Sequence, residues 1–129
     1  MYQTNGLVEV NLKNLLSNYK YLSTLNKGRH TAATIKANAY GLGDYKIIKF
    51  LYKKGCRHFF VASYDEAIKI RYKFKNGFLY VLNGIRKKEC TNYLNDNKII
   101  PVINFRPIKT TTTLLSFIIA KTNSTLVHI

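Results

Sequence analysis

Residues 35–43 read Ile-Lys-Ala-Asn-Ala-Tyr-Gly-Leu-Gly, and this stretch decides the fold. It completes the short, apolar, β-branched run 31–35, which is typical of a buried strand. Two glycines then mark a turn, and apolar residues recur at helical spacing after Asp44. The pattern predicts a strand, a tight turn and a helix. It places Lys36 at the end of the strand, where α/β proteins carry their chemistry.

The same alternation of strand and helix patterns extends in both directions along the chain. Residues 6–10 are predicted as a short strand and residues 12–25 as a helix. Asp44 is predicted to be the N-cap of its helix, and Ser63 with Glu66 forms a capping-box pattern at the start of the next helix. The remaining predictions are strands at 59–62, 78–82 and 99–103, and a weaker helix at about 86–94.

Strands separated by one helix each indicate βα units and a parallel sheet. The predicted fold class is therefore α/β, with about half of a (β/α)8 TIM-type barrel that is incomplete at its C-terminal end. We expect residues 1–104 to form this partial barrel domain. Residues 105–129 are expected to be a divergent tail, because the strand–helix period breaks down after Phe105 and a threonine run follows.

The chain is strongly basic, with 21 Lys and Arg against 6 Asp and Glu and a formal net charge of +15. Such an excess attracts nucleic acids. The lysines are scattered over several predicted helices and form no block, however, which favours a generally basic surface over a specific nucleic-acid site.

The cysteines and histidines form no metal-binding pattern in the sequence. Cys56 and Cys90 are too few for a disulfide framework, and both are predicted to be small buried hydrophobic residues. Charged residues interrupt the N-terminal apolar pattern, and the apolar run 114–120 is too short to cross a bilayer. We expect a cytoplasmic protein with no metal site and no membrane segment.

Spacing alone leaves two interpretations of Lys36 open. A lysine amine must be unprotonated to attack a carbonyl, and partial desolvation at a strand end favours the neutral form. Tyr40 and backbone N–H groups near Gly41 and Gly43 could then donate to the phosphate of a cofactor. The other interpretation is a surface lysine at the end of a strand, with a tyrosine packed over the next helix.

Further residues favour the first interpretation. Residues 36–41, Lys-Ala-Asn-Ala-Tyr-Gly, resemble the pyridoxal-phosphate attachment motif of the alanine racemase family. Four other segments resemble parts of the family's sequence and occur in the same order as they do there. Residues 8–12 resemble its opening segment, residues 61–67 its second barrel strand and the helix start after it, and residues 81–84 and 100–104 the next two strand ends. The resemblance covers about residues 6–104 and implies the N-terminal part of a (β/α) barrel that a β-rich domain follows.

The resemblance implies roles for two residues. Lys36 holds pyridoxal 5'-phosphate covalently and is the catalytic base that moves the α-proton on one face of the substrate. Tyr40 is cofactor-binding and donates its hydroxyl to the phosphate. Leu42 stands where the family usually has a histidine, so the hydrogen bond of that histidine is not expected here.

The implied reaction is the interconversion of L-alanine and D-alanine, which supplies D-alanine for peptidoglycan. In the family, the base on the opposite face comes from the second domain of a partner subunit, which these 129 residues do not include. We expect a truncated fragment that is inactive alone, with a homodimer mate or a complementing chain as its partner. The alternatives are a non-catalytic, single-domain pyridoxal-phosphate-binding protein and, less favoured, a basic nucleic-acid-binding protein.

Overall fold

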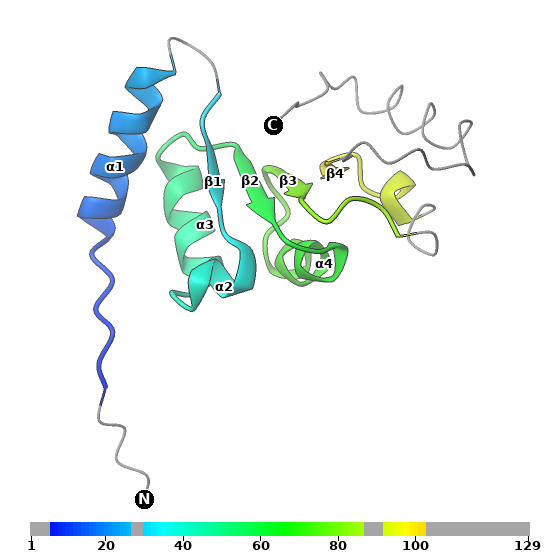
Figure 1. Cartoon of the computed structure of the whole chain (residues 1–129), viewed down its shortest axis with the longest axis horizontal. Helices are drawn as coiled ribbons and strands as arrows, with labels where there is room; N and C mark the ends of the chain where they lie inside the picture. Colours follow the sequence, from blue (N-terminus) through cyan, green and yellow to red (C-terminus); the bar gives the residue numbers. More distant parts are fainter. Residues whose placement is uncertain (1–5, 27–29, 87–91, 103–129) are drawn as a thin grey trace, which may run out of the picture.

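Four parallel strands form a single sheet in the computed structural model, which describes residues 6–26, 30–86 and 92–102. The strands are β1 (Ala32–Thr34), β2 (His58–Val61), β3 (Phe78–Val81) and β4 (Ile99–Pro101). Consecutive strands are neighbours, and all three pairings are parallel (Figure 1). The predicted α/β class with a parallel sheet is confirmed, and in the described part of the chain the sheet does not close into a barrel.

Helices connect the strands as the sequence predicts. The longer ones are α1 (Leu12–Leu25), α3 (Asp44–Lys53) and α4 (Tyr64–Lys73), and the shorter elements are α2 (Lys36–Tyr40) and the 3-10 turn η2 (Asn92–Leu94). The predicted bounds of α1 are confirmed. Its first turn is stabilised by Asn11, whose side-chain oxygen accepts the backbone N–H groups of Lys13 and Asn14.

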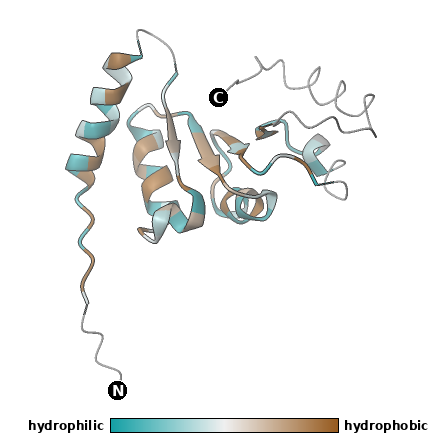
Figure 2. Cartoon of the chain, in the orientation of Figure 1, coloured by the Kyte–Doolittle hydropathy of each residue, from teal (hydrophilic) through white to brown (hydrophobic). Residues whose placement is uncertain are grey.

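The core lies between one face of the sheet and helices α3 and α4. Every second residue of β2 and β3 is buried, as expected for strands with one covered face. The cluster includes Phe59, Val61, Leu79 and Val81 from these strands, Ile47, Ile48 and Leu51 from α3, and Ala67 and Ile70 from α4. Figure 2 shows the hydrophobic segments in β2 and along α3.

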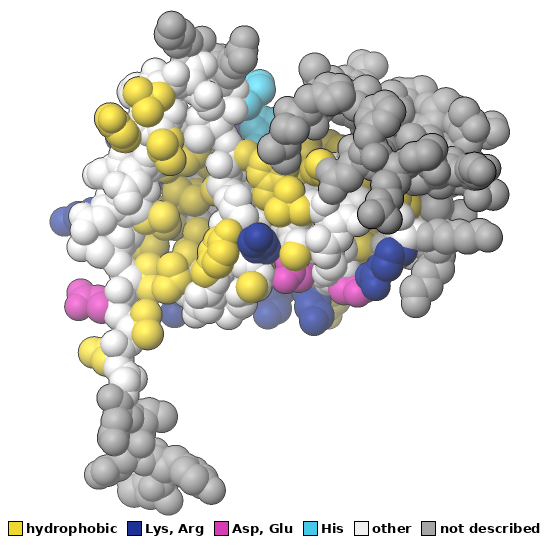
Figure 3. Space-filling view, viewed as in Figure 1, with side chains coloured by type: hydrophobic (Ala, Val, Ile, Leu, Met, Phe, Trp, Pro, Cys, Tyr) yellow, Lys and Arg dark blue, Asp and Glu magenta, His cyan; other side chains and the backbone are white. Residues whose placement is uncertain are grey.

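The opposite face of the sheet carries aromatic side chains that are only partly buried. The His58 ring stacks on Phe78 with centroids 5.4 Å apart, and Phe60 lies 5.1 Å from Tyr80. Nδ1 of His58 is 2.9 Å from the Tyr80 hydroxyl oxygen. Figure 3 shows hydrophobic side chains gathered beside histidine side chains, which are drawn in cyan. This face has no helix of the described residues packed over it.

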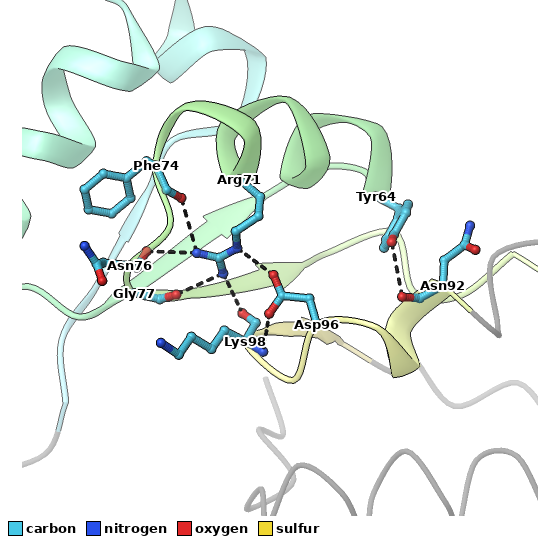
Figure 4. A network of polar contacts seen from close by, with 8 residues as sticks. All are labelled: Tyr64, Arg71, Phe74, Asn76, Gly77, Asn92, Asp96 and Lys98. Atoms are coloured by element: carbon cyan, nitrogen blue, oxygen red, sulfur yellow. Dashed lines mark hydrogen bonds and ion pairs between the residues drawn. The ribbon is translucent and has the colours of Figure 1, made fainter.

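Arg71 links the end of α4 to the starts of β3 and β4 (Figure 4). Its guanidinium donates to the backbone carbonyls of Phe74, Asn76, Gly77 and Lys98 at 3.0 to 3.3 Å. Its Nε lies 2.7 Å from a carboxylate oxygen of Asp96. The sequence analysis did not identify this contact, because it joins residues whose proximity depends on the completed fold.

The structure corrects several sequence-based predictions. Residues 6–10 form no strand, since no strand of the described residues pairs with them and Leu7 and Val8 are 94% and 74% exposed. Asp44 is the first residue of α3, and Gly43 holds the N-cap position without a side-chain hydrogen bond. Of the predicted helix at 86–94, the structure describes only η2 as helical, with residues 87–91 outside the described residues. The predicted tail at 105–129 also lies outside them, so the domain boundary stays a prediction.

Candidate functional site

Lys36 lies at the carboxyl end of β1, the position the sequence predicts for it. The buried residue Ile35 extends the pairing with β2, because its N–H donates to the Phe60 carbonyl at 2.8 Å. The Lys36 side chain is partly buried, and its Nζ lies 5.9 Å from the centroid of the Tyr40 ring. The structure therefore brings together the two residues that the sequence predicts for cofactor binding.

A left-handed turn connects these two residues. Ala37, Asn38, Ala39 and Tyr40 have φ angles of 51°, 55°, 53° and 56°. The left-handed conformation costs L-residues other than glycine roughly 1–2 kcal/mol each, although asparagine tolerates it better. Sequence analysis predicted a tight turn here but not its handedness. Asn38 is a local signal, since asparagine tolerates this conformation, whereas the Cβ atoms of the two alanines carry its steric cost.

Most backbone N–H groups of this turn already have partners. Ala39 donates to the Ile35 carbonyl at 2.9 Å, Gly41 to the Ala37 carbonyl at 3.0 Å and Gly43 to the Asn38 carbonyl at 2.9 Å. In this structure these N–H groups donate within the turn, so their donation to a phosphate stays a prediction. Tyr40 remains as a donor, since its side chain is 62% exposed and its hydroxyl has no hydrogen-bond partner among the described residues.

Two side chains hold the turn from outside. The Asn38 side-chain oxygen accepts the Asp44 N–H at 3.0 Å, which ties the turn to the start of α3. Oε1 of Glu66 accepts the Ala37 N–H at 3.0 Å, which ties the turn to α4. Sequence analysis missed both contacts. The Asn and Glu were visible in the sequence, but their reach across the fold was not.

Only one of the two hydrogen bonds of the predicted capping box forms at the start of α4. The Ser63 hydroxyl oxygen accepts the Glu66 N–H at 3.3 Å, as the pattern predicts. The Glu66 side chain does not return to the N-cap backbone, however. Its Oε2 accepts the Ala62 N–H at 2.8 Å, while its Oε1 binds Ala37. The sequence predicts Glu66 only as part of this capping box, and its contact with Ala37, next to Lys36, was not predicted.

The residues at this strand end fit a cofactor that carries an aldehyde and a phosphate. Within the described residues, no carboxylate lies within ion-pair distance of the Lys36 amine, so the nitrogen is available for covalent chemistry. The ring of Tyr40 lies 5.9 Å from this nitrogen, and its hydroxyl has no hydrogen-bond partner among the described residues. The amine could bond to the aldehyde, and the phenol could donate to the phosphate.

The other chemistry-bearing residues form no second site. Burial raises the pKa of the Cys56 thiol, so Cys56 is a neutral, buried residue as predicted, while Cys90 lies outside the described residues. Across residues 6–26, 30–86 and 92–102, no three His, Cys, Asp or Glu side chains cluster as metal ligands would. In the same residues, none of the helices has the length and apolar character to cross a membrane.

Comparison with known proteins now decides the family. A family profile described as "Alanine racemase, N-terminal domain" matches residues 10–106. This chain belongs to the alanine racemase family. Alanine racemases of Rickettsia prowazekii and Brucella suis are each 37% identical to it, over 98 and 100 residues. These matches cover 75% and 77% of this chain but only 24% and 25% of the relatives, so the chain spans about a quarter of their length.

Solved alanine racemase structures share the fold. The structure of the enzyme from Bartonella henselae, described as having covalently bound pyridoxal phosphate, matches with a TM-score of 0.66 and 35% identity. The match covers 74% of this chain and 28% of that one. The Oenococcus oeni enzyme gives a TM-score of 0.64 at 23% identity, over 73% of this chain and 24% of that one. The four-stranded sheet thus corresponds to an N-terminal portion of the alanine racemase barrel.

Proposed function

We propose that this chain is the cofactor-attachment part of an alanine racemase, with Lys36 as the covalent attachment point for pyridoxal 5'-phosphate. The observation that carries the proposal is the position of Lys36 at the end of β1, with its Nζ 5.9 Å from the Tyr40 ring centroid and a left-handed turn between them. Membership of the alanine racemase family supports it.

The two residues have different tasks in this proposal. The Lys36 amine would hold the cofactor covalently through its aldehyde carbon. When bound, the cofactor would supply the electron sink that makes the α-proton of an amino acid acidic. The Lys36 amine would also serve as the base for that proton on one face of the substrate. The Tyr40 hydroxyl donates a hydrogen bond to the phosphate and so orients the ring.

We propose alanine as the substrate, with D-alanine for peptidoglycan as the product, and the cytoplasm as the place of action. The free thiol of the buried Cys56 supports a reducing compartment. The isolated chain is proposed to hold the cofactor without racemising alanine. Lys36 is the proposed base for one face of the substrate, and the base for the opposite face is expected from a partner. A second copy or a complementing chain is the proposed partner for the complete reaction.

A titration with pyridoxal 5'-phosphate tests the attachment. We expect the full chain to develop the visible absorbance of a carbon–nitrogen double bond between lysine and cofactor, and Lys36→Ala to lose it. Lys49→Ala is a matched control, because Lys49 is an exposed lysine whose Nζ also lies beside a tyrosine, 5.6 Å from the Tyr45 ring centroid. Equal absorbance in all three chains would contradict the proposal.

A further inference from the structure

The carboxylate of Glu66 joins the ends of the two strands beside Lys36. Its Oε1 accepts the N–H of Ala37, which follows Lys36 directly, at 3.0 Å. Its Oε2 accepts the N–H of Ala62, which follows the last residue of β2, at 2.8 Å. A single side chain from α4 therefore sets the spacing between the carboxyl ends of β1 and β2, at the point where the lysine emerges.

The left-handed turn cannot supply this acceptor by itself. The Ala39 N–H donates to the Ile35 carbonyl at 2.9 Å, whereas the Ala37 N–H donates to Glu66 outside the turn. The N–H groups at the start of any helical turn need acceptors from outside it. An ionised carboxylate is a strong acceptor, since its hydrogen bonds are roughly twice as strong as those between neutral groups.

We propose that Glu66 is a positioning residue for Lys36. By fixing the Lys36–Ala37 peptide it holds the left-handed turn, and the turn in turn keeps the Lys36 amine beside Tyr40. Glu66 acts through the backbone and does not contact the cofactor. This inference rests on the proposed function of Lys36, and it goes beyond that function by naming the side chain that prepares the lysine for its reaction.

A purely structural role for Glu66 makes a different prediction. As the third residue of α4, Glu66 also stabilises the start of that helix. If this were its whole contribution, its replacement would lower thermal stability and leave the cofactor affinity of the folded chain unchanged. Ser63→Ala provides the matched control, because it removes the N-cap hydroxyl of the same helix and leaves the contact with Ala37 intact.

The experiment compares the full wild-type chain with Glu66→Gln, Glu66→Asp and Ser63→Ala, well below their melting temperatures. Glutamine has one acceptor oxygen for the two N–H groups, and aspartate is one methylene too short to span them. Titration with pyridoxal 5'-phosphate is expected to give a Kd that is raised roughly tenfold by either Glu66 variant and unchanged by Ser63→Ala. Circular dichroism reports the melting temperature of each chain.

The outcomes separate the two proposals. An unchanged Kd in a folded Glu66 variant overturns the positioning role and leaves the function of Lys36 intact. A Kd that rises in Ser63→Ala in step with the loss of stability also overturns it. A wild-type chain that attaches the cofactor no more at Lys36 than at other lysines overturns the proposed function, and the positioning role with it.

Discussion

Ala37 is the first of four left-handed residues that follow Lys36. It is exposed, so its methyl group contributes little to packing, yet its φ of 51° lies in the left-handed region that glycine adopts freely. The left-handed conformation begins beside Lys36 and continues through Tyr40. Such strained residues persist where the surrounding contacts fix them, here through Glu66 and Asn38.

Replacing Ala37 by glycine is expected to stabilise the chain by about 0.5–1 kcal/mol, because relief of the left-handed strain exceeds the extra entropy of the unfolded glycine. Urea denaturation measures the change. Ala32→Gly in β1 is the control and is expected to lower stability, since that alanine has strand geometry. Equal losses in both variants would show that Ala37 is not strained.

His58 gives the chain a pH-dependent stability. Burial lowers the pKa of His58 below its usual value of 6.5, and the charge of His30 lowers it further. The folded chain therefore binds fewer protons at His58 than the unfolded chain does, so stability is full above pH 6.5 and falls as the pH drops through the lower folded-state value.

Thermal melts across this pH range should show that loss, and His58→Gln should make the curve flatter. His30→Gln is expected to keep most of the slope, because burial of the His58 ring is the larger cause. A slope that is the same in His58→Gln as in the wild type would assign the pH dependence to other groups.

At the scale of elements, the Arg71 contact holds α4, β3 and β4 together. The Arg71 side chain is only 11% exposed and that of its partner Asp96 is 27% exposed. Arg71→Met keeps the aliphatic stem but leaves Asp96 and the buried carbonyls without their donor. We expect a loss of about 2–4 kcal/mol in the free energy of unfolding, measured in urea.

The matched comparison is Arg86→Met, which breaks the ion pair with Asp65 at 3.0 Å. Those side chains are 53% and 71% exposed, so the expected loss is below about 1 kcal/mol. Similar losses in Arg71→Met and Arg86→Met would mean that the Arg71 contact does not stabilise the junction.

The elements differ in how far the sequence predicts them. Helices α1 and α3 and strands β2 and β3 follow from apolar periodicity, because α3 and the two strands each bury one face and α1 packs the partly buried Leu15 and Tyr19 against the core. The prediction of a strand at 6–10 is wrong, because an alternating apolar pattern does not by itself provide a neighbouring strand to pair with. The sequence did not predict the handedness of α2, since residue propensities describe right-handed helices and the left-handed turn depends on a donor from α3 and an acceptor from α4.

In the candidate site too, the sequence predicts what depends on local pattern and misses what depends on the completed fold. Lys36 and Tyr40 were found because the sequence motif places them four residues apart after a strand. Glu66 was missed as part of the site, because its contact with Ala37 spans 29 positions in the chain and forms only when β1 and β2 pair.

At the scale of the whole molecule, the chain carries a four-stranded part of a fold that its relatives continue over about four times its aligned length. We expect the isolated 129-residue chain not to interconvert L- and D-alanine, because Lys36 serves one face of the α-carbon. An assay for D-alanine formed from L-alanine checks this, with Lys36→Ala as the blank. A rate above that blank would contradict the expectation.

The central claim is that Lys36 is the amine that holds the cofactor. The most direct measurement adds a limiting amount of pyridoxal 5'-phosphate to the full chain, reduces the carbon–nitrogen bond with borohydride and locates the label by peptide mass analysis. The account predicts that the label is concentrated on Lys36, despite the many other lysines of this basic chain. A label spread evenly over the surface lysines, with Lys36 no more modified than Lys49, would contradict it.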